Sequence, residues 1–145
     1  MTGVALIRAA RAEDAGAIAR LLTQLGYPGT EGFLPERIRA LAADPDETLV
    51  VAESDGAVIG VLSLHIIPQL AVEGPFARVS YLVVDEAVTG QGIGRALLAY
   101  AESVARECGC DRMELHSATR RTRAHQFYLR EGYEEFPTYF RKRLA

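Results

Sequence analysis

The chain has 145 residues, of which 49% are hydrophobic and 24% are charged, and its net charge is −3. This composition is typical of a globular protein, and the length predicts a single domain over residues 1–145. The weak net charge excludes a general attraction to nucleic acid or to an anionic membrane. No apolar run approaches the roughly 20 residues of a membrane span, and the N-terminus lacks the apolar core of a signal peptide. We therefore expect a cytoplasmic protein.

The apolar pattern predicts strands and helices in the order β-α-α-β-β-β-α-β-α-β. The predicted strands cover residues 4–8, 48–53, 57–67, 76–84, 112–117 and 139–144. The predicted helices cover residues 12–25, 35–43, 92–107 and 122–130. This order predicts a mixed α/β (α+β) sheet with helices on both of its faces.

Two of these helices carry clear apolar stripes. In the first, Ile18, Leu21, Leu22 and Leu25 recur at helical spacing before Gly26. The helix over residues 92–107 should end at Gly109 as its C-cap. Its predicted buried positions are Leu97, Leu98, Ala101, Val104, Ala105 and Cys108.

A glycine-rich loop joins the strand that ends at Leu82-Val83-Val84 to the helix over residues 92–107. Its sequence is Gly90-Gln91-Gly92-Ile93-Gly94. Glycines at alternate positions let the backbone adopt conformations that side chains forbid and let a ligand approach closely. The helix points its unpaired N–H groups and positive dipole end into this loop, an arrangement that binds phosphate. An ordinary glycine-rich turn is the alternative.

The order of elements, this loop and the later segment AHQFYLREGY (residues 124–133) together resemble the GCN5-related N-acetyltransferase (GNAT) family. The resemblance covers essentially the whole chain. It implies a central mixed twisted sheet of about six to seven strands that is splayed between strands 4 and 5. It also implies that acetyl-coenzyme A is the cosubstrate and binds at that splay. The tail ELHSATRRTRAHQFYLREGY and the segment SLHI are similar to aminoalkylphosphonate and related small-amine acetyltransferases.

The resemblance assigns binding residues one position at a time. The strand backbone would pair with pantetheine, the loop would surround the pyrophosphate, and Tyr128 would lie beside the coenzyme sulfur. Three positions depart from the family pattern, since Thr89 replaces Arg or Gln, Arg121 replaces a common Asn, and Ser80 replaces a glutamate that often acts as general base. The coenzyme-binding residues implied are Leu82, Val83, Val84, Thr89, Gly90, Gln91, Gly92, Ile93, Gly94, Arg95, Arg121 and Tyr128.

Acetyl transfer from a thioester needs a neutral amine, a donor to the carbonyl oxygen and a proton for the departing thiolate. The phenol of Tyr128, with a reference pKa of about 10, suits the last task, although Phe127 and Tyr128 could simply pack a short helix. A backbone N–H near Val84 is the predicted donor to the carbonyl. For the base, Glu114 and His116 are preferred because they share one face of a predicted strand. The other candidates are His65, Asp85, Glu86 and a chain of waters.

Other charged residues and the cysteines allow weaker inferences. Arg95, Arg120, Arg121 and Arg123 suit phosphate contacts, with a solvated basic face as the alternative. The early acids favour a solvated helix surface over an amine-attracting wall, and they are Glu31, Glu36, Asp44, Asp46 and Glu47. The spacing of Cys108 and Cys110 suits neither a disulfide framework nor a zinc site. We predict no metal site and no covalent acetyl relay through either thiol.

These patterns predict an acetyl-coenzyme A-dependent N-acetyltransferase that acts on a primary amine of a small molecule by direct attack. A non-catalytic acyl-coenzyme A sensor is one alternative, and an enzyme that acetylates protein N-termini or lysines is another. A dinucleotide-binding module is disfavoured because its glycine motif would follow the first strand of a βαβ unit. The resemblance also implies a homodimer, the commonest symmetric assembly.

Overall fold

A computed structural model describes residues 5–116, 122–136 and 139–145 of the chain. The protein divides into two compact units, Met1–Leu115 and His116–Ala145. The first unit contains the whole sheet and three of the helices. The second contains one helix, α4, over Thr122–Arg130, followed by segments without regular structure over the described parts of residues 131–145.

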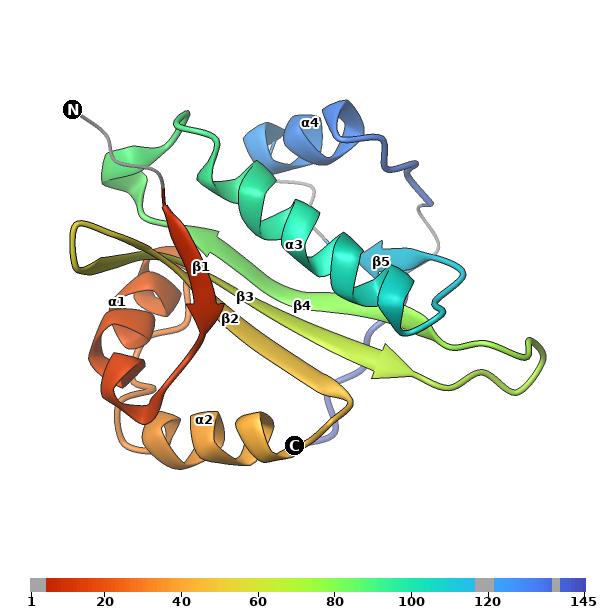
Figure 1. Ribbon diagram of the computed structural model, residues 1–145, viewed down its shortest axis with the longest axis horizontal. Helices are drawn as coiled ribbons and strands as arrows, with labels where there is room; N and C mark the ends of the chain where they lie inside the picture. The colour runs from red at the N-terminus through yellow and green to blue at the C-terminus, as the bar shows by residue number, and fades with distance from the viewer. Residues whose placement is uncertain (1–4, 117–121, 137–138) are drawn as a thin grey trace. The chain divides into compact units, whose positions relative to one another are not determined.

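The sheet has five strands in the order β1-β2-β3-β4-β5 (Figure 1). The first three pairings are antiparallel, and β4 pairs with β5 in parallel. A shift in the pairing of β2 with β3 leaves Ile59 as an extra residue in β3. The strands are β1 (Leu6–Ala9), β2 (Glu47–Ser54), β3 (Ala57–Ile67), β4 (Phe76–Val84) and β5 (Met113–Leu115).

A second bulge lies in β4 at Ser80. Ser63 pairs with Tyr81, but the next residue of β3, Leu64, pairs with Val79, so that Ser80 has no opposite partner. Unbroken alternation from Tyr81 would place Val79 on the same face as Tyr81. The bulge instead leaves Val79 buried on the other face and frees Ser80 to turn independently.

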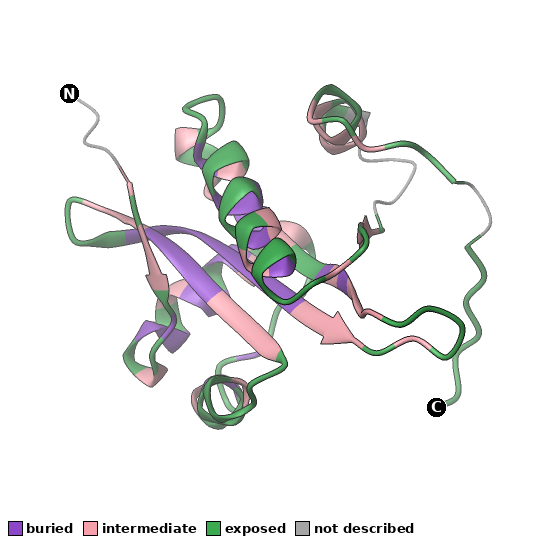
Figure 2. Ribbon diagram, turned by 45° about the vertical axis from the view of Figure 1, so that its right-hand side comes forward, coloured by how far each residue is buried: buried purple, intermediate pink, exposed green. Residues whose placement is uncertain are grey.

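The helices of the first unit cover the two faces of the sheet (Figure 1). Helix α3 (Ile93–Glu107) packs on the face of Gly60, and α1 (Ala15–Leu25) and α2 (Leu34–Ala43) pack on the other. Figure 2 shows the consequence, since buried residues occupy the middle of the strands and the sheet-facing side of α3. The core on the α1/α2 face includes Ile18, Leu21, Leu34, Ile38, Val51, Val61 and Val83.

The predicted order of elements is confirmed as far as α4, and no boundary moves by more than three residues. The prediction of six to seven strands is too high, because the described residues form five. No strand forms over residues 139–145, where Phe140 is 91% and Leu144 is 92% exposed. A strand gains stability only from a paired neighbour and a covered face, and this segment has neither in the described structure of the second unit.

Two expectations at the end of α3 are also corrected. Cys108 is exposed and is the C-cap of the helix, so it does not belong to the buried stripe. Gly109 follows the cap with a φ of 77°, which is the left-handed conformation that commonly terminates helices. The stripe itself is confirmed at Leu97, Leu98 and Ala101.

Candidate active site

One edge of β4 loses its neighbour halfway along the strand. β4 and β5 pair only from Ala77–Met113 to Val79–Leu115. Residues 80–84 continue in β4, but no other strand of the first unit pairs with this edge, since β5 ends at Leu115. The predicted pantetheine-binding residues, Leu82 to Val84, lie in this open stretch. Unpaired strand backbone can form hydrogen bonds to an extended amide chain.

The glycine-rich loop turns from β4 into α3 with a backbone that favours glycine. Gly90 has a φ of 86° and Gly92, the N-cap of α3, has a φ of 79°. Gly92 has no side chain that could cap the first turn of α3, and that turn contains no acidic residue. The loop and the helix dipole therefore present a site suited to an anion. These features fit the pyrophosphate of acetyl-coenzyme A.

The start of α3 lies against the sheet because β3 has a glycine there. A Cβ atom added to Gly60 would lie 2.9 Å from Leu97 Cδ1 and 3.2 Å from Ile93 Cγ2. Real Cβ atoms do not approach other carbons this closely in a packed core. Gly60 thus sets how closely the N-terminal half of α3 approaches the strands beside the open edge.

Side chains of α1 hold the segment that precedes the glycines. Arg20 Nη1 donates to Asp85 Oδ2 at 2.7 Å, and Gln24 Oε1 accepts from the Glu86 backbone N–H at 3.0 Å. The hydrogen bond from the Ala87 N–H, followed by that from Arg20, holds the pKa of Asp85 below its ordinary value. Asp85 is therefore an ionised side chain that stabilises the segment before the glycines, and its contacts argue against the role of general base.

Thr89, one of the departures from the family pattern, has a structural contact of its own. Its hydroxyl donates to the carbonyl oxygen of Glu86 at 2.6 Å. This bond closes the 3-10 turn Glu86–Val88 just before Gly90. Replacing a long donor by threonine therefore leaves the loop backbone ordered, and pyrophosphate contacts from backbone N–H groups stay a prediction.

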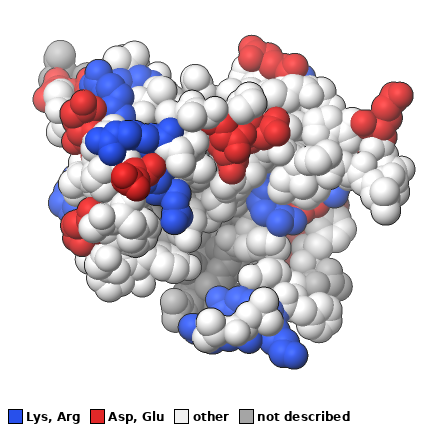
Figure 3. All heavy atoms as spheres, turned by 90° about the horizontal axis from the view of Figure 1, so that it is seen from below, with Lys and Arg blue, Asp and Glu red and all other residues white. Residues whose placement is uncertain are grey.

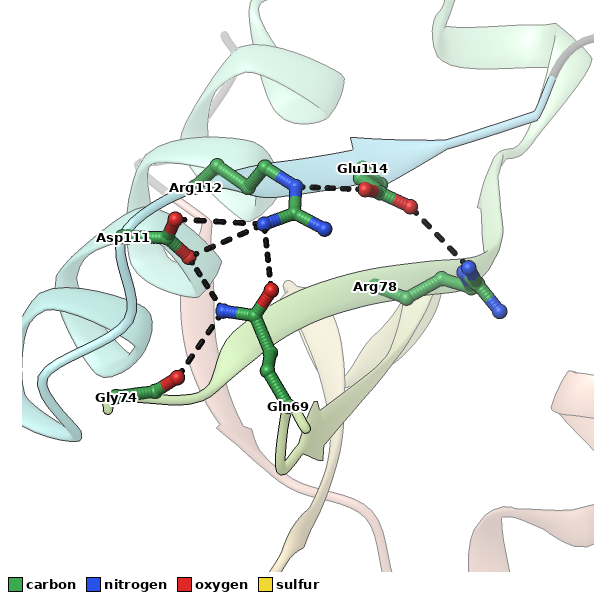
Figure 4. Close-up of polar contacts among 6 residues, drawn as sticks. All are labelled: Gln69, Gly74, Arg78, Asp111, Arg112 and Glu114. Atoms are coloured by element: carbon green, nitrogen blue, oxygen red, sulfur yellow. Dashed lines mark hydrogen bonds and ion pairs between the residues drawn. The ribbon is translucent and has the colours of Figure 1, made fainter. Parts of the chain in front are cut away.

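Glu114, a preferred base candidate, lies in a network of arginines and a glutamine (Figure 4). Its carboxylate accepts from Arg112 Nε at 2.7 Å and from Arg78 Nη2 at 3.1 Å. Partial burial would raise the pKa of Glu114, but these two hydrogen bonds outweigh that effect and hold the pKa below its ordinary value. Arg112 also reaches Gln69, which ties the β3–β4 loop to β5. These ion pairs favour a structural role for Glu114.

His116 lies outside β5, directly after it and in the second unit, where its ring lies 4.2 Å from the ring of Tyr139. The prediction that Glu114 and His116 share one strand is wrong, since the strand ends at Leu115. Their roles as bases stay predictions that no contact among the described residues supports.

The predicted acid, Tyr128, lies on α4. Its ring contacts those of Phe127 at 5.3 Å and Tyr133 at 6.1 Å between centroids. The helix is followed by a left-handed Gly132, where the Tyr133 N–H donates to the Tyr128 carbonyl at 3.0 Å. Its place beside the coenzyme sulfur stays a prediction. Arg120 and Arg121 lie outside the described residues.

A chain of three polar side chains crosses β2, β3 and β4, and the sequence alone does not predict it. His65 Nδ1 lies 2.6 Å from Glu47 Oε2, and His65 Nε2 lies 2.5 Å from Ser80 Oγ. The register explains the first contact, because Glu47 and His65 are paired across the strands. The bulge explains the second. Glu47 therefore belongs to a strand and not to a solvated helix surface as expected.

The remaining features bear on metals, thiols and charge. Among the described residues, no three His, Cys, Asp or Glu side chains are grouped as a metal site. Burial raises the pKa of Cys110, which disfavours its thiolate and agrees with the prediction that it forms no acetyl intermediate. No helix in the described part of the chain has the length and apolar character of a membrane span. Basic and acidic side chains both occur on the face drawn in Figure 3.

The open strand edge and the glycine loop at the start of α3 are the features that the resemblance to the acetyltransferases predicts, and comparison with known proteins shows the family. The model of the acetyltransferase (GNAT) family matches residues 6–133, and the chain belongs to this family. It is therefore an N-acetyltransferase that uses acetyl-coenzyme A as its cosubstrate. The match extends from the first unit into α4.

Individual relatives carry more specific descriptions. The chain is 34% identical to the aminoalkylphosphonate N-acetyltransferase of Salmonella typhimurium, over 95% of this chain and 90% of that protein. It is 29% identical to an aminoglycoside N(6′)-acetyltransferase of Stenotrophomonas maltophilia, over 95% and 93%. Among solved structures, an aminoglycoside N-acetyltransferase in complex with coenzyme A shares the fold, with a TM-score of 0.84, 17% identity and coverage of 100% and 97%.

Proposed function

We propose that this protein acetylates the primary amine of a small molecule, with aminoalkylphosphonates as the first substrate class to test. The observation that carries the proposal is the 34% identity to an aminoalkylphosphonate N-acetyltransferase along nearly the whole of both chains. Aminoglycosides are the second candidate class, supported by the 29% identity to an aminoglycoside N(6′)-acetyltransferase.

The proposed reaction is direct attack of the neutral amine on the thioester carbonyl. The open backbone of Leu82, Val83 and Val84 binds pantetheine, and the loop from Thr89 to Arg95 binds the pyrophosphate. These assignments are supported by the unpaired strand edge and by the left-handed glycines before α3. Tyr128 donates the proton that the leaving thiolate needs. A homodimer is part of the same proposal.

Calorimetric titration with acetyl-coenzyme A, followed by thiol release against a panel of amines, tests this function. The panel contains aminoalkylphosphonates, aminoglycosides, polyamines and peptides. Turnover on an aminoalkylphosphonate supports the proposal, whereas turnover only on peptides would favour a protein acetyltransferase. Binding without any turnover would favour the sensor. Size-exclusion chromatography with light scattering checks the dimer.

Tyr128→Phe tests the acid separately. The substitution keeps the aromatic ring that contacts Phe127 and Tyr133 and removes the hydroxyl group that would donate the proton. We expect kcat to fall by about 100-fold, the lower end of the usual contribution of general acid catalysis, while the dissociation constant of acetyl-coenzyme A stays unchanged. A change confined to binding would contradict the role of proton donor.

A further inference from the structure

The Glu47–His65–Ser80 chain is the strongest arrangement of titratable groups that the coenzyme-binding elements do not use. All three residues belong to the first unit, and each contact is within hydrogen-bond distance. Their exposure is graded, since the side chains of Glu47 and His65 are 21% and 26% exposed while Ser80 is an exposed residue. These hydrogen bonds therefore connect a half-buried carboxylate to a hydroxyl in contact with solvent.

The hydrogen bonds determine which nitrogen of His65 carries a proton. An ionised carboxylate only accepts hydrogen bonds, so Glu47 holds the proton of neutral His65 on Nδ1. Nε2 is then left with its lone pair toward Ser80, and it accepts the hydroxyl proton. The arrangement is that of a base oriented by an acid and aimed at a hydroxyl.

Ser80 lies beside the proposed coenzyme site, and this position would let the arrangement act on a substrate. Ser80 is the first residue of β4 beyond the last pair with β5, Val79–Leu115. It therefore lies at the point where the open edge begins, next to the stretch proposed for pantetheine. The bulge turns its hydroxyl toward His65 and the α1/α2 face, away from α3.

We propose that Ser80 and His65 form a relay that takes the proton from the attacking amine, with Glu47 as the positioning residue. This inference rests on the proposed function. The ammonium nitrogen gives one proton to Ser80 Oγ as the Ser80 hydroxyl proton passes to His65 Nε2, which leaves a neutral amine. The C–N bond forms and the C–S bond breaks, and the sulfur leaves with its electron pair and takes a proton from Tyr128. The second proton that the nitrogen loses returns to Tyr128 through water. His65 later returns its proton to water.

Charged neighbours on the same sheet face are compatible with this role. Arg78 is paired opposite His65 on β4, and Glu114 is paired opposite Arg78 on β5. The Arg78 guanidinium donates to Glu114 at 3.1 Å. The Glu114 carboxylate therefore balances much of the positive charge of Arg78 on the side away from His65. The carboxylate of Glu47 remains in contact with the ring to stabilise the imidazolium that forms.

The test compares kcat/KM across pH in wild type, His65→Gln, Ser80→Ala and Ser80→Thr, with an amine that the wild type acetylates. Near pH 7 the amine is an ammonium ion and needs a base, so we expect His65→Gln and Ser80→Ala to lose at least about tenfold. Above the amine pKa, near 10 for an alkylamine, free amine is abundant and the loss should shrink to a few-fold. Ser80→Thr keeps the hydroxyl and should restore most of the activity.

Three measurements separate the relay from a structural role. Acetyl-coenzyme A binding and circular dichroism should be the same in all four proteins. Nitrogen chemical shifts should show neutral His65 protonated on Nδ1 in wild type, with this preference weakened in Glu47→Gln. His125→Gln, on α4 where the histidine Nε2 lies 3.2 Å from Glu135 Oε2, is the matched control, and its kcat/KM relative to wild type should be the same at every pH.

Each remaining outcome overturns the relay. A loss of the same size at every pH would assign these residues to structure alone. A stable acetyl group on Ser80 after incubation with acetyl-coenzyme A would make Ser80 a nucleophile. Full activity in His65→Gln, with the wild type active, would remove the relay but leave the proposed function intact. Absence of turnover by the wild type on every amine would instead overturn the proposed function, and the relay with it.

Discussion

The two sides of β4 are built from different parts of the chain. On the side proposed for the coenzyme, called the coenzyme side below, backbone dominates, with an open strand edge, two glycines of positive φ and the start of α3. On the α1/α2 face, side chains dominate, with Glu47, His65 and Ser80 in a row. A backbone site depends on conformation and tolerates many side-chain changes, whereas a proton relay depends on the identity of each group.

Two departures from the family pattern fit this difference. Thr89 replaces a long side chain on the side where backbone carries the predicted contacts, and it still orders the loop. Ser80 replaces a glutamate on the side where side chains matter, and a histidine and a glutamate from neighbouring strands accompany that change. The predictions that follow test this contrast on the coenzyme side.

Gly92→Ala should have the largest effect there. A residue with a Cβ is strained at a φ of 79°, so the free loop will relax, and coenzyme binding must restore the left-handed conformation at a cost of about 1–2 kcal/mol. We expect the dissociation constant of acetyl-coenzyme A to rise about tenfold, measured by calorimetry. Gly16→Ala, in the open helical position of α1, is the control and should bind normally. Equal affinities in both variants would break the contrast.

Gly60→Ala should have a moderate effect on stability. The added methyl group would press on Leu97 and Ile93, and overpacking of this kind costs about 1–2 kcal/mol. Urea denaturation should show that loss in the free energy of unfolding. Gly32→Ala has no atom within 4 Å of the new Cβ and should change little. A neutral Gly60→Ala would mean that α3 can move away from β3 freely.

Asp85→Asn should have the smallest effect, because the coenzyme side depends mainly on backbone and this change removes only a side-chain ion pair with Arg20. The pKa of Asp85 is lowered in the folded state, so the stabilisation is present above the unfolded pKa of about 3.9 and is lost as pH falls through the folded value. We expect a loss below about 1 kcal/mol at pH 7 that disappears in acid, measured by urea denaturation at several pH values. Asp55→Asn, in the exposed β2–β3 turn, is the control. A loss that persisted unchanged in acid would contradict the ion-pair explanation.

The sequence predicts local structure well because the local signals agree with each other. The apolar stripe of α3, the glycines before and after it and the apolar run of β4 are each signals contained in a short stretch of sequence. The loop between them carries its own conformational requirement, so the backbone of the proposed coenzyme site could be predicted from one continuous segment. The prediction of a last strand is wrong because residues 139–144 resemble a strand only in their composition.

The relay could not be predicted because it depends on register. The turn pairs Ser54 with Ala57 and Glu53 with Val58, and this register continued without change would place Glu47 opposite Leu64. The extra residue at Ile59 shifts the pairing by one and brings Glu47 opposite His65. A shift of one residue in the pairing moves all following side chains to the opposite face of the sheet. No pattern in the sequence indicates the bulge at Ile59.

The bulge at Ser80 also limits how this chemistry can be moved between proteins. Transplanting glutamate, histidine and serine into a related sheet without the extra residue would aim the serine at the opposite face, where a helix covers it. Conversely, deleting one residue from the first half of β4 would disconnect the relay while leaving all three side chains in the chain. A graft of this site therefore has to carry a strand length as well as three residue identities.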